Sequence, residues 1–232
     1  MSRKLSPEFI RPRNASFAVV LQVREAALQA LLWKRGRDPF RDTWALPGGL
    51  LDEGETLEES IRRHLAAKVD VREVSHLEQL ATYSDPGRDP TTWEIATAYL
   101  GLVELGVDPD VPADTAWHAV DDLPPTAFDH GGIVLAGRER LRGKLSYSNA
   151  GFAIAPATFT LAELREVYVA ALGHEVSATN LRRVLERRAV IGPTGERRPS
   201  GRAGGRPAEV FRFRDAQLAI TDPFAALRPR RH

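Results

Sequence analysis

The charged residues divide this chain into an acidic part and a basic part. Residues 1–150 carry 18 Lys and Arg against 23 Asp and Glu, a net charge of −5. Residues 151–232 carry 14 Arg, no Lys and 8 acidic residues, a net charge of +6, and ten of these arginines lie within residues 177–214. Such an asymmetry between halves indicates a nucleic-acid partner for the basic end. We therefore predict two domains, at residues 1–148 and 149–232.

Composition excludes several classes of protein. Of the 232 residues, 43% are hydrophobic and 27% are charged, which is typical of a globular chain with a buried core. The chain has no cysteine, which excludes disulfides, thiolate metal sites and a cysteine nucleophile, and fits a reducing cytoplasm. No run of about 18 apolar residues is present to span a bilayer, and the first residues lack a secretory signal. We expect a cytoplasmic protein without a membrane segment.

The first predicted domain alternates strand-like and helical segments. Thr56 and Glu59 have the spacing of a capping box, and Leu57, Ile61 and Leu65 give the following helix one buried stripe. Strand-like runs occupy 16–23, 27–35, 76–84, 91–105 and 115–120, with a hairpin turn at Arg24 and Glu25, and a second helix occupies 129–144. This order predicts an α/β or α+β sandwich with helices on the sheet faces.

The second predicted domain begins with two short helices. Thr160 and Glu163 form another capping box, and the helix that they start ends at Gly173. A second helix begins at Ser177, and residues 192–213 resemble two short strands joined by a loop rich in Gly, Pro and Arg. Helix, short turn, helix and basic hairpin is the outline of a winged helix-turn-helix.

The segment around Gly49 carries a specific spacing. Glu55 follows Gly49 after five residues, Arg63 follows Glu55 after seven, Leu65 is apolar, and residues 44–49 read Trp-Ala-Leu-Pro-Gly-Gly. This pattern resembles the Nudix box of hydrolases that cleave nucleoside diphosphates linked to another group. The resemblance implies an α+β fold in which a Nudix-like α/β/α sandwich is followed by the winged helix-turn-helix.

The same segment departs from that family where the chemistry takes place. His64, Ala67 and Lys68 stand where the Nudix box has three glutamates, and Asp70 replaces its last glycine. These positions share one helix face, and Mg²⁺ needs several oxygen ligands that converge there. Glu55, Glu58 and Glu59 remain and could hold at most one metal weakly. Glu58 and Glu59 also suit the helix dipole of a first turn, and we expect His64 to be a partly exposed helix residue. We predict no catalytic residue, metal site or cofactor.

The helix that begins at Ser177 has a polar outer face. Leu181, Val184 and Leu185 form its buried side, which leaves Asn180, Arg183 and Arg187 outside with Arg182 and Arg188 on the flanks. Such a face can enter a major groove, where Arg pairs with guanine and Asn with adenine. A solvated arginine-rich face is the alternative, and the basic wing argues against it. The predicted DNA-binding residues are Thr179, Asn180, Arg182, Arg183, Arg187, Arg198, Arg202 and Arg206.

Two further segments extend the resemblance. Phe128-Asp129-His130 and residues 142–145, together with the degenerate Nudix box and the winged helix, resemble the Nudix-related transcriptional regulators of NAD metabolism. That resemblance implies a homodimeric repressor of NAD biosynthesis or salvage genes that binds a palindromic double-stranded DNA operator. It also implies that ADP-ribose, bound in the Nudix-like domain, releases the operator.

The ligand pocket is expected from three segments: the loop 37–49, the helix start 55–63 and the loop 85–90. In the last of these, Arg88 could meet a diphosphate, or it could belong to a mobile exposed loop. The predicted ligand-binding residues are Arg37, Trp44, Gly48, Gly49, Glu55, Glu59, Arg63 and Arg88. Two other functions stay open: an active ADP-ribose pyrophosphatase that also binds DNA, and an RNA-binding adaptor with a vestigial Nudix fold.

Overall fold

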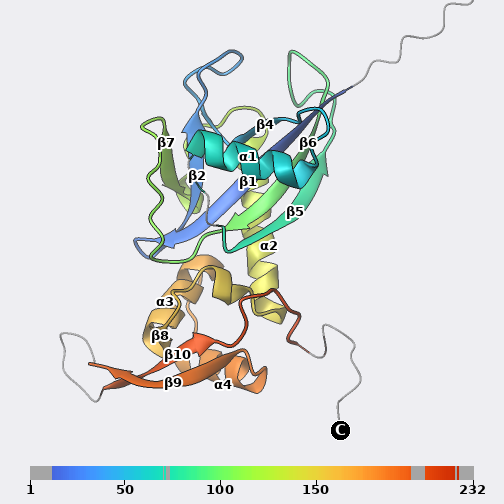
Figure 1. Ribbon diagram of the computed structural model, residues 1–232. Coiled ribbons are helices and arrows are strands. Elements are labelled where there is room, and N and C mark those ends of the chain that lie inside the picture. The colour runs from blue at the N-terminus through green and yellow to red at the C-terminus, as the bar shows by residue number, and fades with distance from the viewer. Residues whose placement is uncertain (1–11, 70, 72–73, 200–206, 223, 225–232) are drawn as a thin grey trace, which may run out of the picture.

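A mixed sheet is the framework of the first part of the chain (Figure 1). The computed structural model describes residues 12–69, 71, 74–199, 207–222 and 224, and among these the sheet has seven strands. Its central order is β3-β2-β1-β6-β5, with β4 paired to β1 and β7 to β2. Only the β1–β6 pairing among them is parallel. The strands are β1 (Arg13–Arg24), β2 (Ala27–Lys34), β3 (Trp44–Ala45), β4 (Gly48–Leu50), β5 (His76–Tyr83), β6 (Glu94–Leu102) and β7 (Thr115–Ala119).

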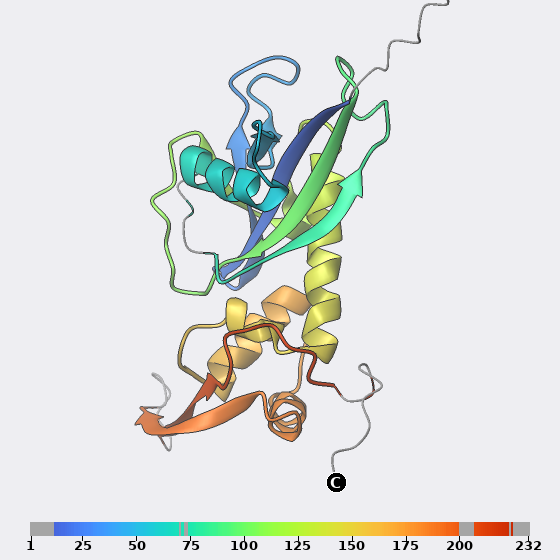
Figure 2. The same cartoon turned by 45° about the vertical axis from the view of Figure 1, so that its right-hand side comes forward.

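One long helix covers each face of this sheet. Strand β1 is buried on both sides, so its alternate side chains pack against α1 (Leu57–Val69) and against α2 (His130–Tyr147). The α1 side includes Ala18, Val20, Ile61 and Leu65, and the α2 side includes Val19, Leu21, Ile133, Val134 and Leu141. Figure 2 shows the resulting layers, with α1 and α2 on opposite sides of the strands. The predicted α/β/α sandwich is confirmed.

Local sequence signals explain where these helices begin and how closely they pack. The amide of Glu59 donates to Thr56 Oγ1 at 3.2 Å, and the amide of Thr56 donates to Glu59 Oε2 at 2.8 Å, as the capping box predicts. On α2, a Cβ added to Gly137 would lie 2.7 Å from Cγ1 of Val19, so this glycine lets the helix approach β1. The hairpin turn lies at Glu25 and Ala26, one residue later than predicted, and both residues have positive φ.

The second part of the chain is a helical unit with a three-stranded sheet. Its helices are α3 (Leu161–Leu172) and α4 (Ala178–Arg187), and its strands are β8 (Phe159–Thr160), β9 (Ile191–Arg198) and β10 (Ala208–Phe213), in the order β8-β10-β9. Thr160 and Glu163 complete the predicted capping box, and Gly173 ends α3 with φ 74°. The predicted winged helix-turn-helix is confirmed.

Helix α2 connects the two parts, and they share one hydrophobic cluster. Two short 3₁₀ helices, η1 (Val120–Asp122) and η2 (Ala150–Ala153), flank it. The amide of Leu105 donates to the carbonyl of Ile154 at 3.3 Å, and Arg142 Nε donates to the carbonyl of Ala171 at 3.4 Å. The boundary between residues 148 and 149 stays a prediction. In the part of the chain that the structure describes, no helix is both long and apolar enough to cross a membrane.

Candidate ligand pocket and nucleic-acid interface

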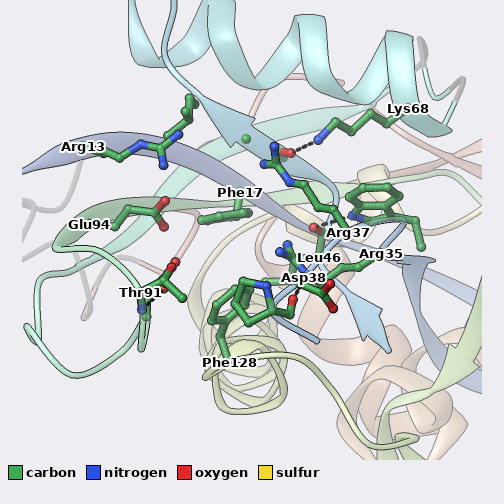
Figure 3. A pocket seen from close by; sticks show the side chains of 16 residues that line it. Arg13, Phe17, Arg35, Arg37, Asp38, Leu46, Lys68, Thr91, Glu94 and Phe128 are labelled. Carbon is green, nitrogen blue, oxygen red and sulfur yellow. Dashed lines mark hydrogen bonds between the residues drawn. The ribbon is translucent and has the colours of Figure 1, made fainter. Parts of the chain in front are cut away.

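A pocket opens beside the amino-terminal end of β1 (Figure 3). Its volume is about 180 Å³, which is below the range of about 300–1,000 Å³ usual for small-molecule sites, and it opens to solvent. Its described lining includes the cations Arg13, Arg35, Arg37 and Lys68, the aromatic residues Phe17, Trp33 and Phe128, and the acids Asp38, Asp89 and Glu94. A ligand that combines an anionic centre, hydroxyl groups and an aromatic ring would match this lining.

Lys68 projects from α1 into one end of the pocket. Its Nζ donates to the carbonyl oxygen of Gly48 at 2.5 Å and lies 4.6 Å from the ring centroid of Trp33. Burial, with the positive charges of Arg37 and Arg35, lowers the pKa of Lys68 to about 8. Figure 3 shows the side chains of Lys68 and Arg37 at the same end of the pocket. This end of the pocket therefore concentrates positive charge.

Gly48 and Gly49 are the part of the pocket lining that lies between β1 and α1. Gly48 has φ 152°, and a Cβ there would lie 2.2 Å from the carbonyl oxygen of Ser16. A Cβ on Gly49 would lie 2.8 Å from Cε1 of His64. Gly48 and Gly49, which are two of the predicted ligand-binding residues, both line the pocket. Because neither has a side chain, β1 can approach Gly48 and the ring of His64 can approach Gly49.

The face of α1 that carries His64, Ala67 and Lys68 makes contacts within the chain. His64 is only 7% exposed, so the expectation of a partly exposed residue is wrong: its Nε2 lies 3.0 Å from the carbonyl oxygen of Leu50. Burial lowers the pKa of His64, and the ring is committed to the loop before α1. Among the described residues, no group of His, Asp and Glu side chains is placed to hold a metal ion.

The start of α1 lies beside the pocket wall and is not part of it. Arg63 donates to both carboxylate oxygens of Glu55 at 2.7 Å, and this pairing lowers the pKa of Glu55 to about 2. Glu59 caps the helix, and Glu58 pairs with Arg62 at 2.9 Å. The contacts of the predicted segment 55–63 therefore hold the preceding loop against α1. The residue of α1 that lines the pocket is Lys68.

Two other predicted ligand residues also lie outside the lining. The side chain of Arg88 is only 3% exposed and pairs with Glu94 at 2.8 Å and with Asp129 at 2.7 Å, although the preceding residues of its loop are exposed. These pairs join the loop 85–90 to the start of α2. Trp44 packs against His118 with ring centroids 4.3 Å apart, and Trp33, not Trp44, reaches the pocket.

The segment Phe128-Asp129-His130 builds the pocket wall. Phe128 lines the pocket, and Asp129 holds Arg88. The Nδ1 atom of His130 accepts from the amide of Leu46 at 3.0 Å, and burial lowers the pKa of His130 to about 3, which keeps this ring neutral. Sequence reasoning used this segment only as a family marker. The lining residues Arg13, Phe17, Arg35 and Glu94 carried no motif and were missed.

Helix α4 presents an exposed polar face. Ser177 caps the helix by accepting from the amide of Asn180 at 3.4 Å, and Oδ1 of Asn180 accepts from Arg183 at 2.8 Å. Thr179 and Arg187 are exposed with them. The structure thus brings together Thr179, Asn180, Arg183 and Arg187 as predicted.

The flanking arginines behave differently from this face. Arg182 pairs with Glu186 at 2.9 Å and lies 5.5 Å from the ring centroid of Phe211 on β10. The side chain of Arg188 is 8% exposed and pairs with Asp222 at 2.9 Å, so its predicted place on the outer flank is wrong. It points inward because it also donates to the carbonyl of Ser146, at the end of α2.

The predicted wing is the hairpin of β9 and β10. Arg198 donates to Glu163 at 3.0 Å and to Oγ1 of Thr158 at 2.6 Å, so internal partners already take up much of its charge. Arg197 is exposed on the same strand. The predicted DNA-binding residues Arg202 and Arg206 lie outside the described residues.

Comparison with known proteins connects the pocket and the helix. Residues 12–136 match the NUDIX domain family, and residues 151–213 match the NrtR DNA-binding winged helix domain. The crystal structure of Shewanella oneidensis NrtR complexed with a 27mer DNA is 32% identical, with a TM-score of 0.74, and the match covers 86% of this chain and 93% of that one. The chain belongs to the NrtR family. Within this family, it combines a Nudix domain and a winged helix domain in one polypeptide.

Other relatives include both a regulator and an enzyme. The ADPR responsive transcriptional repressor NtrR of Acinetobacter baylyi is 29% identical over 92% of this chain and 86% of its own length. The NUDIX domain of Shewanella oneidensis NrtR complexed with ADP ribose is 32% identical over 60% of this chain and 94% of its own, with a TM-score of 0.52. The ADP-ribose pyrophosphatase of Methanocaldococcus jannaschii is 34% identical over 45% of this chain and 62% of its own length.

Proposed function

We propose that this NrtR-family protein is a transcriptional repressor that binds double-stranded DNA and releases it when ADP-ribose occupies the Nudix pocket. The observation that carries the proposal is the pairing, in one chain, of an exposed Asn and Arg face on α4 with a cation-lined pocket on a degenerate Nudix helix. The relatives named for ADP-ribose, for DNA and for repression support the same combination.

The pocket chemistry favours ADP-ribose among nucleotide ligands. Its diphosphate would lie at the end formed by Lys68, Arg37 and Arg35, where charge-assisted hydrogen bonds are available. The adenine ring would pack on Phe17 or Phe128, and carboxylates such as Glu94 would accept from ribose hydroxyl groups.

The assembled form that we propose is a homodimer on a palindromic operator. A single recognition helix covers only a few base pairs, whereas two of them related by a twofold axis read half-sites spaced by about 10 base pairs or a multiple of that. The regulated genes would be those of NAD biosynthesis or salvage, since ADP-ribose is a product of NAD turnover.

A second candidate is an ADP-ribose pyrophosphatase that also binds DNA, and the likeness to the Methanocaldococcus jannaschii enzyme favours it. The helix face argues against it, because His64 is bound to Leu50, Ala67 has no oxygen and Lys68 is a cation. We expect no appreciable release of AMP from ADP-ribose with Mg²⁺ or Mn²⁺. Turnover near the median of about 10 per second for enzymes would favour the hydrolase.

The decisive experiment is a gel shift on the DNA upstream of neighbouring NAD-synthesis genes, with and without ADP-ribose. We expect a protein–DNA complex that dissociates when ADP-ribose is added. An excess of unrelated duplex DNA should not displace the labelled DNA from it. An equal amount of complex with and without ADP-ribose would contradict the proposal that ADP-ribose is the effector. Preference for single-stranded RNA over the duplex would favour an RNA-binding adaptor instead.

A further inference from the structure

The Nudix fold implies a divalent cation on the face of α1 that carries positions 64, 67 and 68. The residues present do not fit one. A hard cation requires converging oxygen ligands, and this face offers an imidazole held by Leu50, the methyl group of Ala67 and the ammonium of Lys68. An ammonium group at this place repels Mg²⁺ and attracts a phosphate.

We propose that Lys68 supplies, from within the chain, the positive charge that a divalent cation would otherwise supply to the ligand's diphosphate. Nucleoside diphosphate ligands then bind this pocket without a metal ion. The inference rests on the proposed function for the identity of the ligand, but it concerns how the pocket recognises the diphosphate.

The contacts of Lys68 hold it in position without neutralising it. Its ammonium group has three donors, and the carbonyl of Gly48 takes one of them at 2.5 Å. The ring of Trp33 lies 4.6 Å away and favours the charged form. Within the described part of the chain, no ion pair with a carboxylate takes up its charge.

The neighbours of Lys68 make this end of the pocket favourable for an anion. Arg37 and Arg35 are close enough to act on Lys68 electrostatically, and both line the same pocket. Arg35 is itself fixed, since its Nε donates to the carbonyl of Pro39 at 3.0 Å and its guanidinium lies 4.7 Å from the ring centroid of Phe128. Burial, and after it repulsion by Arg37 and Arg35, lowers the pKa of Lys68, and a bound diphosphate would offset that repulsion.

The first test is calorimetric titration of ADP-ribose into the full-length protein, once with EDTA and once with Mg²⁺. We expect the two dissociation constants to agree within about twofold. Binding that requires Mg²⁺ would overturn the role of Lys68 and leave the proposed function standing. Absence of binding under both conditions would overturn the proposed function and this inference together.

The second test replaces the charge. In EDTA, Lys68→Met should weaken ADP-ribose binding by roughly ten- to a hundredfold, the usual loss for one hydrogen bond to a charged group, and Lys68→Arg should recover most of it. Lys34→Met is the matched control. Lys34 also lies over a tryptophan, 5.1 Å from the Trp44 ring centroid, but outside the pocket. This substitution should leave the affinity for ADP-ribose unchanged.

A third measurement separates charge from shape. Adenosine lacks the diphosphate, so its affinity should be the same for Lys68→Met and for the unchanged protein. An equal loss of affinity for adenosine and for ADP-ribose in Lys68→Met would show that Lys68 only shapes the pocket. An unchanged affinity for ADP-ribose would show that Lys68 does not bind the diphosphate. Either result would overturn the proposal. Thermal unfolding midpoints verify that each variant is folded, and Lys68→Arg keeps the test open if Lys68→Met is not.

Discussion

At the scale of single residues, the pocket depends on close backbone approach. Gly48 adopts a φ of 152°, and its α-carbon faces the backbone of β1 so closely that any side chain would meet Ser16 and Phe17. Gly143, in contrast, lies on the exposed side of α2 with open space around it. The two glycines therefore make a matched pair, in which only one is required by structure.

We expect Gly48→Ala to lower the free energy of unfolding by roughly 2 kcal/mol or more, from strain in φ and from overpacking. Gly143→Ala should raise it by about 0.5–1 kcal/mol, because alanine favours the interior of a helix. Urea denaturation of both variants measures the difference. Equal effects of the two substitutions would contradict this account of Gly48.

His130 adds a dependence on pH. Burial lowers its pKa to about 3 in the folded chain, against an ordinary value of about 6.5. The unfolded chain therefore binds a proton on this ring below pH 6.5 while the folded chain does not, so this contribution to stability is present above pH 6.5 and is lost as the pH falls toward 3.

The test is His130→Asn, whose side-chain oxygen can still accept from the amide of Leu46. The variant should be less stable at pH 7.5, because it loses ring contacts with Phe17 and Phe128. Between pH 6.5 and 4.5, the original chain should lose about 1 kcal/mol per pH unit more than the variant. Urea denaturation across this range should give curves that converge; parallel curves would count against the assignment.

At the scale of elements, α4 has two distinct faces. Leu181 and Leu185 are buried, and Asn180, Arg183 and Arg187 remain exposed on the other side. The hydrogen bond between Asn180 and Arg183 orients two side chains that can read base edges. Arg182 and Arg188 leave this face for partners within the domain.

We predict that Arg183→Ala costs about 1–3 kcal/mol on the operator and relaxes preference at one base position, whereas Arg202→Ala weakens all sequences alike and lowers the salt slope by about one. Arg62→Ala is the control, since Arg62 is an exposed helix arginine in an i,i+4 pair on α1, away from α4. Titration of specific and random duplexes at several salt concentrations distinguishes these effects. Unchanged operator preference in Arg183→Ala would mean that α4 is not the reading helix.

At the scale of the whole molecule, α2 joins the pocket to the winged helix domain. Phe128 in the pocket wall lies just before α2, and near the other end Arg142 donates to the carbonyl of Ala171 in α3. The carbonyl of Tyr147 accepts from the amide of Thr221 at 2.9 Å. A shift of α2 on ligand binding would therefore reach the element against which α4 packs. A ligand can change DNA binding only if its affinity differs between the free and bound arrangements.

Linkage makes this coupling measurable from both sides. If ADP-ribose weakens operator binding tenfold, the operator must weaken ADP-ribose binding tenfold, a coupling of about 1.4 kcal/mol. Calorimetric titration of ADP-ribose into free protein and into the protein–operator complex should show this difference. Lys68→Met should shift the titration of free protein and leave operator binding without effector unchanged. Equal ADP-ribose affinities for free and DNA-bound protein would exclude it as the effector.

The sequence by itself determined the features that depend on neighbouring residues. Capping boxes at Thr56 and Thr160, the end of α3 at Gly173 and the outer face of α4 all follow from spacings of a few residues. The loss of the helix carboxylates was also visible, because positions 64, 67 and 68 share a face in any α-helix. Such signals need no knowledge of distant contacts; together with the order of the elements and the resemblance to the Nudix box, they predicted both domain folds.

Only the tertiary structure decided where the long polar side chains went. Lys68 meets the carbonyl of Gly48, 20 residues away; Arg88 meets Asp129, 41 residues away; and Arg188 meets Ser146, 42 residues away. A long cationic side chain can turn to solvent or to a buried acceptor, and spacing along the chain does not distinguish these choices. The sheet and α2 bring the acceptors within reach, and burial then makes each contact favourable, because an unpaired polar group removed from water is costly.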